Sequence, residues 1–559
     1  MKNLGCYFYL KVNLAIFITC ILGFGFVLSM PALANSGQYL VATQAAGKKD
    51  FDTASKNFLS ILNNDFSEEI VIQEALLFSV LANDVNAALK LSEISDKRDI
   101  MLPTVGLMSL VRFYKNKDFK RVYNLLSRYD RTLPTYLIIL AEGWTKIANG
   151  SFIAGLETFS LLDGTNRYLG LYNCAIAFSM QGDFHKALPY LEELEGKKLK
   201  FDEMQLVALA QIYSNNNLND KAISLLEDQI RGQRFNIFEE VLVKLRNRKK
   251  LKYDVFVTPE DALSNVFYLM GNTNDQIKTN PIAASFYIRL AEFLSVRKDF
   301  YSLRVAEIFA DMGAFTYSTE KFDKVSREDL FYLRAQLGAA DTLVRSGKDN
   351  SAKRILEQLI KEGFNEFVIY DSLADIFRAN ENYKEAIFYY DKALHNISED
   401  SKNEKWATFF VRGISHDQSG DWKKAKDDFI TALELSKDHP EVLNYFGYSL
   451  IERNENLEEA LKMIESAVSQ RPESGYIVDS LAWGLFKLGF YKEAIVPMER
   501  AIQLEPHDPI VNDHLGDVLW MIGRKREAAF QWQRALSFGP TSENEKKIKE
   551  KLKFGITDL

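Results

Sequence analysis

The sequence predicts an all-α protein, a superhelix or α-solenoid of stacked antiparallel helix pairs. Three observations lead to this prediction. Alanine recurs at a nearly constant interval in the C-terminal third, a bulky residue stands four positions after most of these alanines, and 12 prolines and 29 glycines are few for 559 residues. A single core usually stops growing near ~250 to 300 residues, so a chain of this length divides into domains or stacks repeats.

The first 34 residues differ from the rest and are expected to be a secretory signal peptide. Lys2 and Lys11 are the only charges before residue 35, residues 12–30 form an uncharged apolar run, and a proline and small residues follow up to Ala34. This order is typical of an exported protein that is cleaved after Ala34. The apolar run also approaches the ~18 residues that can span a bilayer, so an uncleaved membrane anchor is the alternative.

Residues 35–243 are expected to form a helical array with a degenerate version of the repeat. Ala54, Ala187 and Ala222 take the place of the recurrent alanine, each with a bulky residue four positions later. Cys174 lies in a helical pattern here and is the one cysteine left after cleavage. The mature protein would therefore have no internal disulfide, and its stability must come from packing.

Residues 244–282 interrupt this pattern and are predicted to form an irregular connector followed by a helix. A short β-like run follows the basic residues, and Thr258 and Asp261 can then form a capping box around a proline at the first helical position. We expect a hinge between two arrays here. The basic cluster is either a solvated loop or a contact for anionic lipid headgroups or an acidic partner. Its members are Arg246, Arg248, Lys249, Lys250 and Lys252.

The C-terminal region contains the regular repeat. Residues 283–365 are predicted to form degenerate helical repeats, residues 366–540 a well-formed array, and residues 541–559 a C-terminal helix and tail. Apolar-small pairs such as Leu481-Ala482 precede each first alanine by about thirteen residues and let two helices cross closely. A second alanine follows seven positions after the first in most units, and a proline ends the later units. The first alanines, spaced by 34, 39, 35, 34 and 34 residues, are Ala352, Ala386, Ala425, Ala460, Ala494 and Ala528.

This pattern of apolar-small, aromatic, Ala, bulky, Ala and Pro over 34 positions resembles the tetratricopeptide repeat family. Residues 479–494 and 513–536 are also similar in sequence to exported proteobacterial proteins of that family that are associated with envelope assembly. The resemblance implies a concave groove that binds a protein or peptide. It also implies that the second, fifth, ninth and twelfth residues of each unit line this groove.

Acidic and aromatic side chains alternate at these groove positions. This chemistry suits an extended protein segment, and the acids favour a basic or amine-bearing one over a terminal carboxylate. We expect the aspartates to be exposed, because carboxylates are rarely buried unpaired, whereas each tryptophan either faces the groove or packs between repeats. The predicted groove residues are Asp371, Asp375, Asn444, Tyr448, Asp479, Trp483, Phe486, Asp513, Asp517 and Trp520.

The sequence contains no recognisable catalytic or cofactor motif. It has no HExxH, Walker loop, GxSxG or paired-cysteine pattern, so we predict neither an enzyme nor a cofactor. Within residues 513–517, Asp513 and Asp517 share a helix face, with His507 and Asp508 nearby, which would suit a divalent cation. Asp508 and Asp513 equally suit the start of a helix, whose dipole favours carboxylates, and no metal is predicted. The net charge of −7 gives no reason to expect nucleic-acid binding.

These features together predict a non-catalytic scaffold or chaperone-like adaptor of the bacterial cell envelope. It would be exported to the periplasm and would hold an extended segment in its concave face. The alternative is a regulatory subunit of an envelope enzyme or assembly complex, tethered to the inner membrane by an uncleaved N-terminus.

Overall fold

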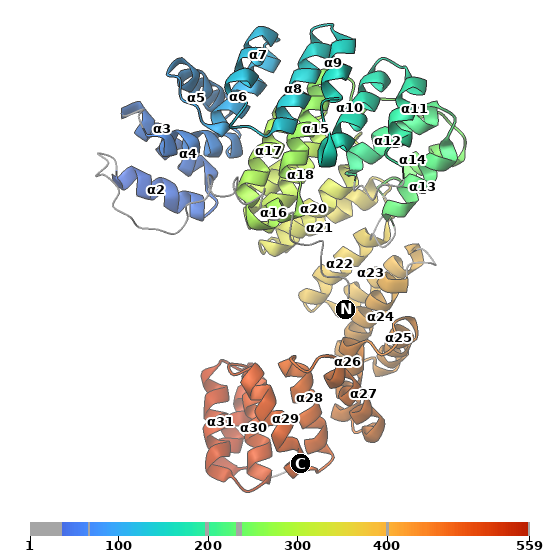
Figure 1. Ribbon diagram of the computed structural model, residues 1–559. Coiled ribbons are helices and arrows are strands. Elements are labelled where there is room, and N and C mark those ends of the chain that lie inside the picture. The colour runs from blue at the N-terminus through green and yellow to red at the C-terminus, as the bar shows by residue number, and fades with distance from the viewer. Residues whose placement is uncertain (1–35, 65–67, 196–200, 231–236, 398–401, 557–559) are drawn as a thin grey trace, which may run out of the picture. The chain divides into compact units, whose positions relative to one another are not determined.

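The computed structural model describes residues 36–64, 68–195, 201–230, 237–397 and 402–556. Within these ranges the chain forms 31 α-helices, one short 3-10 turn and no strand, which confirms the predicted all-α class (Figure 1). The predicted signal peptide lies outside the described residues. None of the described helices combines the length and the apolarity that a membrane span requires.

The contacts divide the chain into two compact units. The N-terminal unit comprises residues up to Leu226 together with Val241–Tyr332, and the C-terminal unit comprises Glu227–Glu240 together with Leu333–Leu559. Three helices lie at the boundaries: α13 (Asn219–Ile230), α14 (Glu239–Arg246) and α20 (Tyr332–Arg345).

The N-terminal unit begins with consecutive antiparallel hairpins. Ala54, Ala187 and Ala222, the predicted counterparts of the recurrent alanine, are fully buried between helices. The helices of the first series are α2 (Ser36–Gly47), α3 (Phe51–Asn64), α4 (Glu69–Leu81), α5 (Val85–Lys97), α6 (Pro103–Lys115), α7 (Phe119–Arg128), α8 (Thr135–Ala148), α9 (Phe152–Phe159), α10 (Arg167–Met180), α11 (Phe184–Glu192) and α12 (Glu203–Asn215).

A second series of helices in the N-terminal unit packs back against the first (Figure 1). The helix α17 contacts α4 and α6, and α15 contacts α8, so these helices do not extend a single stack as expected. Arg289 of α17 anchors this packing, because its Nε donates to the carbonyl oxygen of Val80 at 3.2 Å. The series comprises α15 (Pro259–Gly271), α16 (Asn274–Thr279), α17 (Pro281–Leu294), α18 (Lys298–Asp311) and α19 (Phe315–Phe322).

The predicted connector lies inside this unit and differs from the expected hinge. The backbone N–H of Leu251 donates to Ser214 Oγ at 3.0 Å, and Gln211 Nε2 donates to Asp254 Oδ1 at 2.8 Å. Side chains of α12 thus hold this segment by hydrogen bonds that the local sequence does not reveal, and the expected β-like run forms no strand. The predicted capping box is confirmed, since Thr258 and Asp261 pair reciprocally at the start of α15.

The C-terminal unit is a stack of helical hairpins in which each repeat supplies two helices. In five successive repeats the first alanine, from Ala386 to Ala528, is fully buried between the paired helices. Gly516 shows why the crossing needs a small residue, because a Cβ there would lie 2.4 Å from the Trp532 ring. The helices are α21 (Asp349–Lys361), α22 (Phe367–Ala379), α23 (Tyr383–Asn396), α24 (Lys402–Gln418), α25 (Trp422–Leu435), α26 (Pro440–Glu452), α27 (Leu457–Gln470), α28 (Gly475–Lys487), α29 (Tyr491–Leu504), α30 (Pro509–Met521), α31 (Lys525–Ser537) and α32 (Ser542–Phe554).

Candidate functional site

The first helices of three successive repeats, α26, α28 and α30, form a groove of about 460 Å³ in the C-terminal unit. Prolines at the first position of α26 and α30 begin these helices, and small residues at the crossings let the repeats stack closely. The side chains of equivalent positions therefore lie next to one another. The groove is lined by Asn444, Tyr445, Tyr448, Tyr476, Asp479, Ser480, Glu505, Asp508, Ile510 and Val511.

Three tyrosines and the amide of Asn444 form part of the wall of this groove. Tyr476 is 53% exposed, Ile510 is also exposed, and Tyr445 and Tyr448 are half-buried. Burial raises the pKa of Tyr445 to about 12 and also raises the pKa of Tyr448, so both phenols are hydrogen-bond donors at neutral pH. The side-chain oxygen of Asn444 is buried and has no hydrogen-bond partner among the described residues. The groove thus offers apolar area and unused hydrogen-bonding capacity.

Asp479 lines the groove and pairs with His514 of the next repeat. His514 Nδ1 is 3.0 Å from Asp479 Oδ2 and 3.1 Å from Oδ1. Burial alone would lower the pKa of His514, but the carboxylate of Asp479, with those of Asp513 and Asp517, raises it above its ordinary value. This pair joins two repeats inside the unit, so Asp479 is a buried structural carboxylate.

Trp483 and Phe486 of α28 pack next to the Asp479–His514 pair. The Trp483 ring stacks on His514, with centroids 4.0 Å apart, and on Phe486, with centroids 4.9 Å apart. Its indole N–H donates to the carboxylate of Glu452. Phe486 is buried in the core, which corrects its predicted groove position, and Trp483 packs between neighbouring repeats.

The C-terminal helix α32 covers three predicted groove residues of the last repeat. Lys551 of this helix lies 2.9 Å from Asp513 and 2.7 Å from Asp517. Trp520 packs against the Trp532 ring, and a side chain at Gly555 would collide with it. The carboxylates considered for a divalent cation therefore bind a lysine. Within the described ranges no group of three or more histidines, cysteines or acids could hold a metal ion.

Asp371 and Asp375 of α22 are also paired. Asp371 is buried and accepts a hydrogen bond from Thr408 Oγ1 at 3.2 Å. Asp375 is half-buried and accepts from the Tyr390 hydroxyl at 2.6 Å and from Arg378 at 3.2 Å. Their carboxylates therefore contribute to packing within and between repeats.

The expected exposure of the aspartates is wrong for Asp371, Asp479 and Asp517, which are buried with partners. Three of the ten predicted residues, Asn444, Tyr448 and Asp479, come together at the groove, and the others do not. Sequence reasoning missed Tyr476 and Ile510 as groove residues, although both occupy the second position of their repeats, one of the positions that the family resemblance implied.

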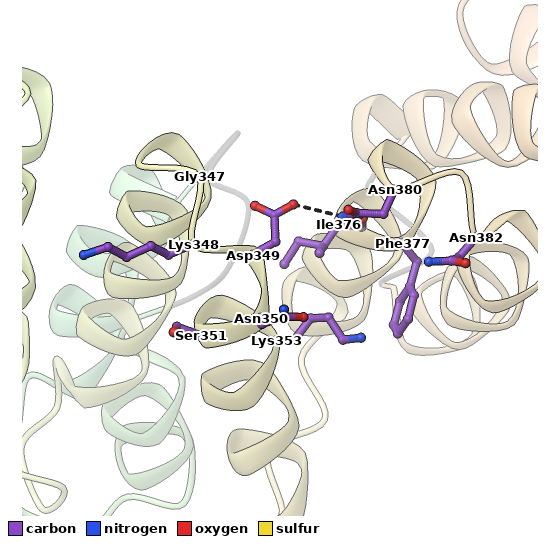
Figure 2. Close-up of a pocket in the computed structure, with 10 residues that line it drawn as sticks. All are labelled: Gly347, Lys348, Asp349, Asn350, Ser351, Lys353, Ile376, Phe377, Asn380 and Asn382. Carbon is purple, nitrogen blue, oxygen red and sulfur yellow. Dashed lines mark hydrogen bonds between the residues drawn. The ribbon is translucent and has the colours of Figure 1, made fainter.

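A second hollow of about 430 Å³ lies where α21 and α22 meet (Figure 2). Two contacts join the helices across it. Asn380 Nδ2 donates to Asp349 Oδ2 at 2.9 Å, as the dashed line marks, and Lys353 Nζ lies 4.1 Å from the centroid of the Phe377 ring. These contacts hold adjacent hairpins together, so this hollow is a weaker candidate for partner binding than the groove.

Known sequences match part of this chain, including one repeat unit. The model of the tetratricopeptide repeat family matches residues 369–405. A TPR repeat-containing protein of Pseudomonas aeruginosa is 26% identical over 164 residues, which amount to 29% of this chain and 27% of the relative. The matched region thus spans about a quarter of the relative's length.

Solved structures with a similar helical arrangement cover different shares of the chain. The APC/C hetero-tetramer Cut9-Hcn1 has a TM-score of 0.40 at 13% identity, covering 94% of this chain and 97% of its own. A tetratricopeptide repeat protein from Parabacteroides merdae has a TM-score of 0.37 at 18% identity, covering 45% and 96%. YrrB, described as a TPR protein with an unusual peptide-binding site, has a TM-score of 0.27 at 18% identity, covering 35% and 97%. The family model thus shows a tetratricopeptide repeat at residues 369–405, and the repeat spacing and the buried alanines support the same kind of unit in the following hairpins of the C-terminal unit.

Proposed function

We propose that the protein is a non-catalytic interaction scaffold or chaperone-like adaptor whose C-terminal unit binds an extended segment of a partner protein. Tetratricopeptide repeat folds bind protein or peptide partners. The segment would lie across α26, α28 and α30, in the groove that Asn444, Tyr476 and Ile510 line. Successive repeats present equivalent side chains at regular intervals, which suits a ligand that is itself extended.

One observation carries this proposal: the buried side-chain oxygen of Asn444 has no hydrogen-bond partner among the described residues. Leaving such an oxygen unsatisfied costs about 1–3 kcal/mol. A main-chain N–H of a bound segment would satisfy it after a small rotation of the amide. The neighbouring rings of Tyr448 and Tyr476 would cover the apolar side chains of the same segment.

The partner segment is proposed to carry a basic or amine-bearing residue. Glu505 is exposed at the groove. Asp508 lies at its edge, where Oδ1 accepts from the backbone N–H of Ile510 at 2.8 Å and keeps a carboxylate near the groove. Asp479 is already paired with His514, so Glu505 and Asp508 are the acids that support this choice.

Crosslinking with a matched structural variant tests the binding site. A photoreactive residue at Tyr476 should crosslink a partner in cells, and Asn444→Leu should abolish that crosslink. This substitution removes the unsatisfied oxygen without creating an unpaired group, so stability should be unchanged or higher. A photoreactive residue at Val496, which is 71% exposed on α29 of the same repeat, is the control. Equal crosslinking from Val496, or persistence of the Tyr476 crosslink in Asn444→Leu, would rule out this groove.

We also propose that the protein works in the bacterial cell envelope, exported to the periplasm. The charge and apolarity pattern of residues 1–34 supports this location. Intact-mass measurement of the protein from the periplasm and from membranes tests it. Loss of residues 1–34 supports export. Retention of these residues in the membrane fraction would instead indicate the tethered regulatory subunit.

A further inference from the structure

The region of α5, α6 and α7 carries a basic charge that the whole chain does not. Residues 90–131 contain ten lysines and arginines and five acids, a net charge of +5, whereas the whole chain has a net charge of −7. The three helices enclose a groove of about 630 Å³ in the N-terminal unit. Among the residues that line it are Lys97, Arg112, Arg121 and Arg128. This groove belongs to a different unit from the one proposed above for the extended segment.

Among these four basic residues, Arg112 is held in place by contacts with Asp96 and Phe113. Its guanidinium pairs with Asp96, which also accepts from Ser109 Oγ at 2.8 Å. It lies 4.7 Å from the centroid of the Phe113 ring, and the Arg121 guanidinium lies 5.7 Å from the same centroid. The ring, itself buried, thus draws two arginines from different helices to one side of the groove.

Arg121 and Arg128 form an accessible row along α7. They are seven residues apart, so they share one face of the helix about 10 Å apart, with Asn124 between them. The Arg121 side chain is 68% exposed, and its Nε lies 3.3 Å from Asp118 Oδ2. Arg128 pairs with Asp99, whose side chain is more exposed than that of Arg121. Exposed ion pairs contribute little to stability, so another carboxylate can replace these partners at little cost.

We propose that this groove binds an acidic segment of a partner protein, whose carboxylates pair with Arg121 and Arg128. Two carboxylates about 10 Å apart match residues i and i+3 of a segment in the extended polyproline II conformation, which rises about 3.1 Å per residue and has three residues per turn, so that both side chains face the same way. The groove also contains Glu93, Asp96 and Asp118. These carboxylates would repel the fixed array of phosphates on a lipid surface or a nucleic acid, whereas a flexible acidic peptide can place two of its carboxylates on Arg121 and Arg128 and turn the others to solvent. The geometry therefore favours an acidic peptide over a lipid surface or a nucleic acid.

A direct binding measurement on the full chain tests the proposal. The probe is a fluorescein-labelled octaglutamate peptide, and fluorescence anisotropy at low salt reports its affinity, with labelled octalysine as the comparison. Arg121→Glu together with Arg128→Glu should weaken octaglutamate binding at least tenfold. Both side chains are exposed, so circular dichroism and thermal melting should match the unsubstituted protein.

The control variant combines Lys90→Glu and Lys120→Glu. These exposed lysines lie on α5 and α7 outside the groove, and their reversal changes the net charge by the same amount. Octaglutamate binding within twofold of the unsubstituted protein in this control supports the groove. Equal loss in both variants, or no binding of octaglutamate by the unsubstituted protein, overturns the proposal. Tighter binding to phosphatidylglycerol vesicles or duplex DNA that Arg121→Glu and Arg128→Glu abolish would show that the ligand class is wrong.

Discussion

Replacing Lys551 with methionine is expected to destabilise the C-terminal repeat by about 2–3 kcal/mol. The lysine Nζ lies 2.7 Å from Asp517 and 2.9 Å from Asp513, and the Asp517 side chain is only 5% exposed. Removing one partner of a buried ion pair costs about 3–5 kcal/mol, because a charge is left without compensation. The Lys551 side chain is 21% exposed, so water can reach the site and the expected loss is smaller. Methionine retains most of the apolar length of lysine, which preserves the packing of α32.

Hydrogen exchange measured by mass spectrometry is the appropriate assay, because stacked repeats do not always unfold as one cooperative unit. Peptides covering α30 and α32 should lose protection by roughly 30- to 150-fold in Lys551→Met, the equivalent of the expected free energy. Peptides covering the N-terminal unit should keep their protection. The matched control is Lys549→Met, which removes an exposed pair with Glu545 on the same helix and should change protection very little.

The pH dependence of this variant has a defined sign. Burial raises the pKa of Asp517 to about 6 although Lys551 lowers it. The folded state therefore holds a proton between about pH 4 and 6 that the unfolded chain releases, and this group's contribution to stability is lost as the pH rises through about 6. Removal of Lys551 raises this pKa further, so the loss of protection should be smaller at pH 5 than at pH 8. Equal losses at both pH values, or equal losses in Lys551→Met and Lys549→Met, would refute the role given to the lysine.

Three further substitutions test the packing. Ala494→Leu should cost roughly 1–3 kcal/mol in urea unfolding, since Ala494 is fully buried, while Val496→Leu on the same helix should be near neutral; equal effects would contradict the assigned helix crossing. Asp479→Ala should cost about 1–3 kcal/mol because His514 loses its buried partner, and a change below about 0.5 kcal/mol would mean that the carboxylate is exposed after all. Glu292→Gln should lower the thermal midpoint of the N-terminal unit by several degrees, since Glu292 is buried among charged partners; an unchanged midpoint would exclude this role.

The repeat architecture was predictable because one repeat encodes it locally. The spacing of Ala460, Ala494 and Ala528 specifies which face of each second helix is buried, and the structure places all three at full burial. The small residue at Gly516 likewise follows from the close approach of Trp532. These features depend on neighbours within one hairpin, where sequence distance and spatial distance agree.

The candidate site was predictable in part. The groove positions came from the family resemblance, which the repeat period placed on this chain, and Asn444, Tyr448 and Asp479 are the three of them that line the groove. Their roles were not predictable, because the partner of a polar side chain comes from another repeat. His514 reaches Asp479 from 35 residues along the chain. In the same way α32 covers residues that an uncapped repeat would expose.

By itself, the sequence determined the all-α class, the repeat period and the buried alanines of the C-terminal unit, since helix periodicity and side-chain size act within a few turns. The tertiary structure decided which acids are exposed and which are paired, and that the later helices of the N-terminal unit pack against the earlier ones. The physical reason is that burial of a carboxylate depends on the single cation, imidazole or hydroxyl that meets it. That meeting is settled by how repeats stack and where the chain returns, which no local pattern records.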